Sequence, residues 1–298
     1  MSANPGKPPG PPAFLSKGAG AGMPPHPLTL DGSAVLHQMF KVRWVAWQSA
    51  TPAERDAAAD ELGGFLRDRE EQADSGSAAF AILGHKGDLL VLHFRPDFEA
   101  LGRAERAVQR LRLQEFLQPV SSYVSVVELG LYDSSVKLYQ EMHGEGIAVD
   151  SDEWKARVRA RMDEQAAAMA PRLAPAIPPH TFLCFYPMDK KRGERHNWYS
   201  VPIDQRRRMM REHGMIGRRF AGRVRQIISG SIGFDDWEWG VDLFADDPLV
   251  FKQLIYEMRF DEASALYALF GPFYICQRLT AAAIGDWLEV DGPGAATA

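Results

Sequence analysis

The chain has 298 residues, of which 46% are hydrophobic and 24% are charged, and these values are ordinary for a soluble globular protein. Its formal net charge of -5 argues against nonspecific nucleic-acid binding through the whole surface, and no apolar stretch approaches the ~20 residues needed to cross a bilayer. Cys184 and Cys276 lie in apolar, strand-like segments, so we interpret them as core residues rather than a disulfide or metal pair. A reducing cytoplasm is then the simplest compartment.

The N-terminal region is expected to stay outside the fold. Residues 1–34 begin with a segment dense in proline and glycine and have no continuous apolar core, which predicts a disordered or polyproline-like tail rather than a secretion signal. The first strand is predicted over Leu36–Trp47, where apolar and polar residues alternate. A helix follows, for which Thr51 is a plausible N-cap and Pro52 suits the first helical position.

One order of elements occurs twice along the chain. Residues 35–132 predict strand-helix-strand-strand-helix-strand, and residues 179–285 repeat this order. Between them, residues 133–178 predict a connector whose helix starts after Ser151 and runs to about Met169. Residues 286–298 predict a flexible tail.

The repeated order is that of the ferredoxin-like unit, in which an antiparallel sheet carries both helices on one face. The other face of each sheet needs cover, and two copies in one chain satisfy that need by pressing these faces together. The sequence therefore predicts an α+β fold in which two tandem ferredoxin-like repeats form a dimeric α+β barrel, with antiparallel sheets inside and helices outside. The concave interior of one half is then expected to hold a sizeable ligand.

Candidates for chemistry lie in the second half, and each has a plain structural alternative. His213 is predicted to end a helix, with Gly214 after it as the C′ residue, so it either complements the helix dipole or offers an axial ligand to a haem iron. Tyr186 ends a strand and is otherwise an aromatic residue at a sheet edge. The cations that follow form either a solvated loop or a binding site for carboxylates on an apolar ligand, and they are Lys190, Lys191, Arg192 and Arg195.

Three longer segments resemble one known family. They are CFYPMDKKRGERHNWY (184–199), HGMIGRRFAGRVRQIISGSIGFDDWEWGVDLF (213–244) and EMRFDEASALYALFGPF (257–273). They are similar to the chlorite dismutase superfamily and, within it, to the coproheme decarboxylases. The resemblance runs nearly throughout from Arg172 to about Leu279, and SSYVSVVEL in the first half is also typical.

This resemblance implies a subunit of a homopentamer that acts in the coproporphyrin-dependent haem pathway. The implied substrate is Fe-coproporphyrin III (coproheme), which also serves as redox cofactor, and the implied oxidant is hydrogen peroxide. Propionates 2 and 4 would be oxidatively decarboxylated to vinyl groups, giving haem b and carbon dioxide. Transient contact with coproporphyrin ferrochelatase is also expected, with no nucleic-acid partner and no membrane span.

The resemblance also implies roles for single residues. His213 corresponds to the iron ligand, Tyr186 to the tyrosine whose radical takes hydrogen from a propionate, and Lys190 to the lysine that positions the second propionate. Trp198 corresponds to a tryptophan beside the tyrosine. The remaining implied haem contacts are a pocket residue, a distal residue and three propionate anchors, namely Met188, Gln226, Arg172, Arg259 and Ser264.

Two alternatives stay open at this stage. One is a haem-binding or haem-transfer protein without turnover, which would not require Tyr186 together with Lys190. The other is a chlorite dismutase or peroxidase-type haem enzyme, but true chlorite dismutases carry an arginine where this chain has Gln226. The chain departs from the family pattern at Leu131, where asparagine is common, and in its longer connector.

Overall fold

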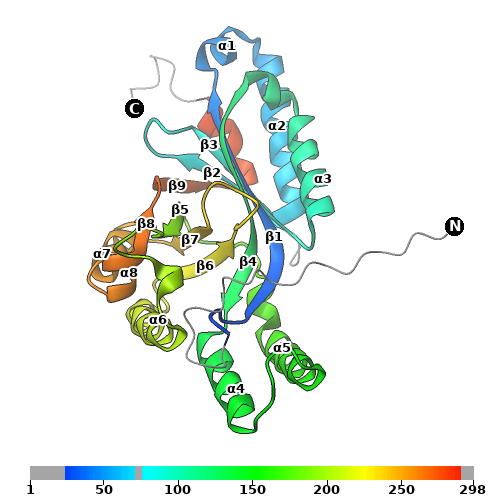
Figure 1. Cartoon of the computed structure of the whole chain (residues 1–298). Helices are drawn as coiled ribbons and strands as arrows, with labels where there is room; N and C mark the ends of the chain where they lie inside the picture. Colours follow the sequence, from blue (N-terminus) through cyan, green and yellow to red (C-terminus); the bar gives the residue numbers. More distant parts are fainter. Residues whose placement is uncertain (1–23, 71–75, 290–298) are drawn as a thin grey trace, which may run out of the picture.

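Two sets of strands and helices follow one another along the chain (Figure 1). The computed structural model describes residues 24–70 and 76–289, so residues 1–23 and 290–298 of the two predicted tails lie outside the described residues. The elements of the first half are β1 (Thr29–Val42), α1 (Trp44–Ser49), α2 (Pro52–Glu70), β2 (Ser77–Ile82), β3 (Leu89–Arg95), α3 (Phe98–Gln109), the 3-10 helix η2 (Arg112–Phe116) and β4 (Leu117–Gly130).

Two helices connect the halves, namely α4 (Tyr132–Gly144) and α5 (Asp152–Leu173). The second half then repeats the order of the first with a few short additions. Its elements are β5 (Phe182–Lys190), η3 (Trp198–Ser200), α6 (Ile203–Arg218), β6 (Arg225–Gly230), β7 (Trp239–Ala245), α7 (Leu249–Met258), α8 (Glu262–Tyr267), β8 (Ala268–Phe270), β9 (Tyr274–Leu279), η4 (Ala281–Ala283) and α9 (Ile284–Leu288).

The strands of both halves join in one antiparallel sheet. Its order is β7-β6-β4-β1-β3-β2-β9-β5-β8, and a further pairing between β5 and β7 closes eight of these strands into a ring. The halves meet twice in this ring, where β4 pairs with β6 and where β2 pairs with β9. The predicted α+β class, with antiparallel strands and helices, is confirmed.

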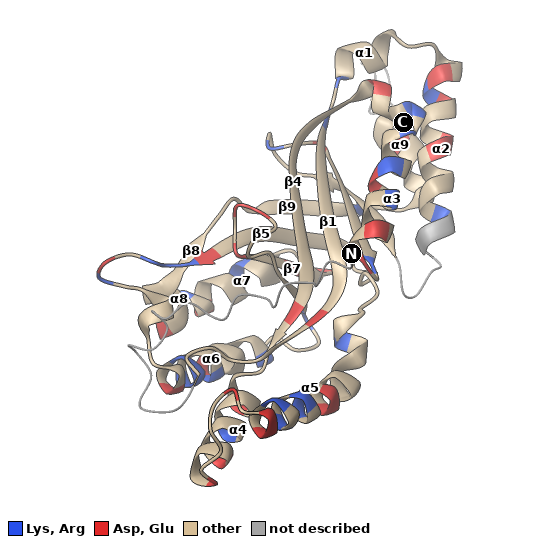
Figure 2. Ribbon diagram, turned by 45° about the vertical axis from the view of Figure 1, so that its right-hand side comes forward, with Lys and Arg blue, Asp and Glu red and all other residues tan. Residues whose placement is uncertain are grey.

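Side chains alternate between the inside of the ring and its outer face, as the period of a strand requires. The inside is filled by a core drawn from both halves, including Val35, Phe80, Leu92, Phe185 and Phe244. The helices lie outside the strands (Figure 1), and most charged residues lie on helices and loops, while the strands carry fewer of them (Figure 2). Each half therefore has a sheet face that meets its own helices.

The start of the chain differs from the prediction in two places. Strand β1 begins at Thr29, inside the segment expected to be tail, and it stops at Val42 rather than Trp47. Val42 pairs with Leu117, the first residue of β4, so no partner strand remains beyond that point. The chain turns into α1 instead, where Trp47 is buried and its Nε1–H donates to the Leu288 carbonyl at 2.9 Å.

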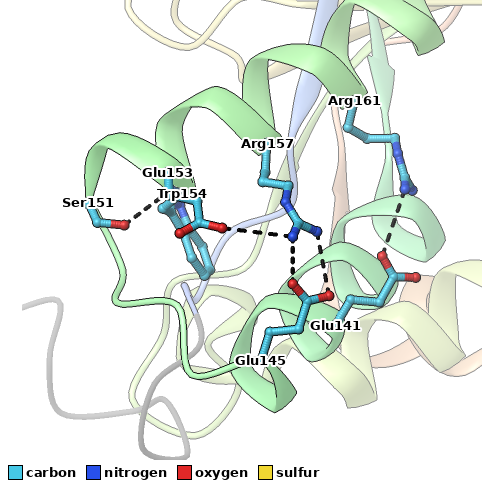
Figure 3. A network of polar contacts seen from close by, with 7 residues as sticks. All are labelled: Glu141, Glu145, Ser151, Glu153, Trp154, Arg157 and Arg161. Atoms are coloured by element: carbon cyan, nitrogen blue, oxygen red, sulfur yellow. Dashed lines mark hydrogen bonds and ion pairs between the residues drawn. The ribbon is translucent and has the colours of Figure 1, made fainter.

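The connector forms a helical hairpin of α4 and α5 (Figure 3). Ser151 caps α5 as predicted, because its hydroxyl accepts a hydrogen bond from the Trp154 backbone N–H at 3.1 Å. The indole of Trp154 stacks on the Tyr139 ring of α4, with the ring centroids 5.5 Å apart. Arg157 pairs with Glu145 across the hairpin at 2.5 Å. Because exposed ion pairs contribute little, the buried aromatic stack is the main contact between the two helices.

The cysteines and the helices agree with the sequence analysis. Cys184 and Cys276 are both buried and free, and burial raises the pKa of the Cys184 thiol to about 12, as expected for core thiols. Among the described residues, no helix combines the length and the apolar composition needed to span a bilayer.

Candidate functional site

Strand β5 points its candidate residues to the outer face of the ring. Tyr186, Met188 and Lys190 stand at every second position of the strand, so they share one face, while Phe185, which precedes Tyr186, belongs to the core inside the ring. Tyr186 and Met188 pack in an apolar cluster with residues of β7, α6 and α7. The strand thus carries a phenol, a thioether and an ammonium in a row toward the helices.

The pairing of β5, β7 and β6 extends this face sideways. Tyr186 pairs with Val241, and Val241 pairs with Ile228. One step along the strands, Leu243 of β7 pairs with Gln226. Directly paired residues share a face, so Gln226 lies on the face of Tyr186, two strands sideways and two residues along, which places it about 12 Å away. Ile228 remains 39% exposed although it stands in the Tyr186 row, which shows that the helices do not cover this part of the sheet.

Tyr186 itself is enclosed by aromatic rings. Its side chain stacks on Phe273, with ring centroids 4.6 Å apart, and the centroid of Phe270 is 5.7 Å away. Burial raises the pKa of Tyr186 strongly, with Cys184 adding to the rise and the Arg259 cation opposing it. The residue is therefore a neutral phenol throughout the physiological pH range.

Helix α6 faces this sheet and carries His213. The prediction that His213 ends its helix is wrong, because α6 continues to Arg218. Gly214 is not a C′ residue either, because its φ is not positive. The positive-φ glycine that follows α6 is Gly222. The helix continues because Ile216 packs into the apolar cluster of Tyr186. His213 and Ile216 are three residues apart and share that side of the helix.

A carboxylate holds the His213 ring. Its Nδ1 lies 2.9 Å from Oδ2 of Asp261, and the Ser264 hydroxyl lies 3.4 Å from the same nitrogen. Burial pushes the pKa of Asp261 up, but its hydrogen bonds with His213 and Ser264 outweigh burial and leave that pKa below its usual value. An ionised Asp261 accepts a hydrogen bond from the Nδ1–H of His213. The lone pair of the ring is then on Nε2, as in histidines that bind a metal and are held by a carboxylate.

Asp261 is a functional candidate that the sequence interpretation missed. It is the N-cap of α8 and accepts a hydrogen bond from the Ser264 backbone N–H at 2.9 Å. An aspartate at the start of a helix is a capping signal that the sequence shows. The contact of Asp261 with His213 spans 48 residues and has no sequence pattern. The Ser264 hydroxyl, which we expect to anchor a propionate, donates to Asp261 at 3.1 Å.

Lys190 is buried rather than part of a solvated loop. Its backbone N–H donates to Glu238 at 2.9 Å, and its Nζ donates to the Ala263 carbonyl at 3.3 Å. Burial lowers the pKa of Lys190 to about 8, and the nearby Asp261 and Glu238 carboxylates limit the fall. The lysine is therefore charged at neutral pH but close to releasing its proton.

Trp198 lies beside this lysine rather than beside Tyr186. The Lys190 Nζ sits 4.5 Å from the centre of the indole ring, and the ring of Tyr267 is 5.4 Å away. The ring contacts of Tyr186 in the described residues are Phe270 and Phe273 instead. We expected Trp198 to neighbour Tyr186, but in the structure it makes a cation–π contact with Lys190.

The two predicted arginine anchors differ in their surroundings. Arg259 follows α7, is exposed, and stacks its guanidinium 4.0 Å from the centre of the Phe270 ring, which puts a cation next to the Tyr186 cluster. Arg172 is exposed at the end of α5, and its side-chain contact in the described residues is Met169 of the same helix. The structure brings Arg259 to the site and leaves Arg172 apart from the other candidates.

Together these residues suit a haem with acidic side chains. His213 offers one nitrogen, and the described residues contain no group of three His, Cys, Asp or Glu side chains placed to hold a metal ion by themselves. A single protein ligand above an apolar face is the donor set of a haem iron, because the porphyrin supplies the other four ligands. The open sheet at Ile228 and the cations Lys190 and Arg259 fit a flat apolar ligand with carboxylates.

The profile of the family described as chlorite dismutase matches residues 55–279. The chain belongs to this family. A member from Staphylococcus saprophyticus named coproheme decarboxylase is 42% identical over 85% of this chain and 94% of its own length. A protein of Haloquadratum walsbyi, provisionally named as haem-binding, is 43% identical over 88% of this chain, which spans only 47% of that relative.

Solved structures also resemble this chain. A haem-binding protein from Thermus thermophilus is 37% identical, with a TM-score of 0.75 over 90% of this chain and 100% of its own. A mutant chlorite dismutase from Candidatus Nitrospira defluvii is 13% identical, with a TM-score of 0.64 over 87% of this chain and 96% of its own. At that identity the second likeness shows the fold alone.

Proposed function

We propose that this protein is a coproheme decarboxylase, which uses hydrogen peroxide to convert propionates 2 and 4 of coproheme into vinyl groups and so forms haem b. The observation that carries the proposal is the shared face of Tyr186 and Lys190 on β5, next to the helix that carries His213. A protein that only binds haem needs the histidine but neither the enclosed phenol nor the buried ammonium. Similarity to a coproheme decarboxylase over most of the chain supports the same reaction.

His213 would hold the iron of the substrate through Nε2. The Asp261 carboxylate fixes the ring and its tautomer through Nδ1, which strengthens Nε2 as a donor. Coproheme, when bound, supplies the redox chemistry that uses peroxide. Apolar residues of β7 and α7 pack around Tyr186 and exclude water from its side chain.

Tyr186 would transfer the hydrogen. Its phenol is neutral, so it can give up a proton and an electron together and then accept a hydrogen atom from a propionate β-carbon at the same oxygen. Each propionate side chain loses two electrons and one β-hydrogen, releases carbon dioxide and remains on the ring as a vinyl group. One peroxide takes up these two electrons, the proton of the β-hydrogen and one proton from solution, and becomes two waters, so atoms and charge balance.

Lys190 would hold a reacting propionate. Its ammonium is the only charge on the β5 side chains that face the helices at this end, and burial strengthens its attraction for a carboxylate. Arg259 would attract another propionate beside Phe270. For Met188, Trp198 and Gln226 we propose contacts with the porphyrin.

Chlorite decomposition is the less favoured activity of this site. Gln226 is a neutral amide, and it lies on the sheet face of Tyr186 where the resemblance predicts the distal side of the haem. A neutral amide cannot balance the charge of an oxychlorine anion as an arginine does. We also propose the cytoplasm as compartment, a homopentamer as assembly, and transient contact with coproporphyrin ferrochelatase, all on the basis of family similarity.

Tyr186→Phe tests the proposal. The variant keeps the ring that stacks on Phe273 but loses the oxygen, so coproheme binding should persist while turnover falls at least about 100-fold. Peroxide is added to the coproheme complex, and the porphyrin mass is followed; each vinyl formed removes one carbon dioxide and two hydrogens from the acid form.

Tyr256→Phe is the matched control, because Tyr256 is 65% exposed on α7. It should react as the wild type does. Full turnover by Tyr186→Phe would remove the tyrosine from the mechanism, and an unchanged porphyrin mass in the wild type would refute the enzyme.

A further inference from the structure

Arg206 of α6 is a buried cation without a carboxylate partner in the described residues. Its side chain donates to the Pro25 carbonyl, while its Nε is buried and lacks a hydrogen-bond partner there. The ionisable groups that influence it are the phenols Tyr132 and Tyr199 rather than any acid. Residues 1–23, which precede Pro25, contain no aspartate or glutamate that could supply one.

This isolation is unusual for an arginine. Arg206 is only 4% exposed, and arginines are rarely so buried unless they are paired, because a buried charge without a counter-charge is strongly unfavourable. A guanidinium stays charged at any physiological pH, so the protein cannot escape this cost by releasing a proton. An anion that arrives with a ligand would remove the cost.

The position of Arg206 connects it to the haem site. Arg206, Met209 and His213 are spaced three and four residues apart and lie along one side of α6. Seven residues at 1.5 Å each put Arg206 about 10 Å from His213 along the helix axis. Because propionates project from the rim of a porphyrin, a guanidinium displaced this far from the iron ligand is placed for the rim rather than for the metal.

Arg206 and Lys190 also meet on one indole ring. The Arg206 Cζ lies 5.9 Å from the centre of the Trp198 ring, and the Lys190 Nζ lies 4.5 Å from it. Trp198 packs with Met209 and Ala263, and Ala263 precedes Ser264 of the His213 cluster. Two cations therefore flank a single tryptophan beside the histidine.

We propose that Arg206, together with Lys190 across Trp198, forms a carboxylate subsite that takes a propionate of the bound porphyrin. The identity of the ligand rests on the proposed function, whereas the need for an anion rests on the isolation of Arg206. The competing role is a latch in which Arg206 only holds the Pro25 carbonyl and so fixes the start of the chain against α6.

Arg206→Gln separates the two roles. Glutamine keeps an N–H donor for the Pro25 carbonyl but removes the charge. Iron-free coproporphyrin III, with four carboxylates, and its tetramethyl ester are titrated into the full chain, and binding is followed by porphyrin fluorescence. We expect the variant to bind the tetra-acid about tenfold or more weakly than the wild type, as for loss of a charged hydrogen bond, and to bind the ester equally.

The matched control is Arg207→Gln, because Arg207 is half-buried on the same helix turn and already pairs with Asp204 at 3.7 Å. It should leave both affinities unchanged. Thermal melting of the ligand-free proteins reports folding, and Arg206→Gln should melt no lower than the wild type because it removes an isolated buried charge.

Each result has one meaning. Wild-type affinity of Arg206→Gln for the tetra-acid would leave only the latch and overturn the subsite, while the proposed function would stand. An equal loss for acid and ester would show a general disturbance of the pocket and would also overturn it. Absence of coproporphyrin binding by the wild type would overturn the proposed function and the propionate ligand together.

Discussion

The two halves of the chain present similar sheet faces to their helices, but the first half fills its face and the second leaves part of it open. In the first half, Leu62 and Leu66 of α2 belong to one apolar cluster with Leu89 and Val91 of β3, and all four are buried. In the second half, Ile228 is 39% exposed on the face that meets α6. The same fold thus has a packed helix-facing side in one copy and a partly exposed one in the other.

A pair of histidines shows the same difference. His93 on β3 is fully buried, and its ring nitrogens bond to Ser77 at 2.7 Å and to Gln38 at 3.0 Å. His213 on α6 uses Nδ1 for Asp261, and its side chain is 24% exposed. A histidine with both nitrogens bonded holds a structure together, whereas one with a single bonded nitrogen can still bind iron.

The largest expected effect separates these two histidines. His213→Ala should abolish the absorption and electron paramagnetic resonance signals of histidine-ligated iron in the coproheme complex, because it removes the ligand. His93→Ala should keep those signals but lower the free energy of unfolding by about 1–3 kcal/mol, since Gln38 and Ser77 lose a buried partner. An unchanged iron spectrum in His213→Ala would mean that another residue binds the metal.

A smaller effect compares the packed face with the open one. Leu66→Ala should cost about 2–5 kcal/mol of unfolding free energy in urea titrations of the ligand-free protein, because it leaves a cavity in a full core. Ile228→Ala should cost less than about 1 kcal/mol, because its side chain is already partly exposed. Equal losses for the two variants would show that the second face is packed as well as the first.

The smallest effect concerns the charge on Lys190. Burial lowers its pKa to about 8, so the ammonium is present below that pH and lost above it. Only the charged form attracts a carboxylate, so coproheme affinity should stay constant below pH 8 and fall by up to about tenfold per pH unit above it. Dissociation constants measured from pH 7 to 10 check this. Lys190→Arg should keep its affinity across that range, and a wild-type affinity that rises with pH would contradict the assignment.

Local patterns predicted the elements that both halves repeat. The strands alternate clearly, and the Thr51 cap formed as expected, with the Glu54 carboxylate accepting the Thr51 backbone N–H at 2.8 Å. Helix α4 was missed, although Val136, Tyr139 and Met142 are buried on it at helical spacing. Its signal was present, but α4 lies in a connector that the repeated pattern does not cover.

Contacts between distant segments could not be predicted in this way. The extension of α6 past Gly214 depends on where Ile216 docks, and the bond between His213 and Asp261 joins separate helices. The burial of Lys190 depends on Trp198 and Ala263 closing around a strand end that looks like a cationic loop in the sequence. Resemblance to a family named these residues, but only the fold shows which of them touch.

The ring of strands makes the two halves inseparable in a practical sense. The half that carries His213 borders its neighbour through β6 and β9, and each of these strands is completed by hydrogen bonds to a strand of the other half. Expressed alone, that half would bare two strand edges, which are templates for aggregation. The first half, which contributes few candidate residues, therefore protects the second by covering both of its strand edges.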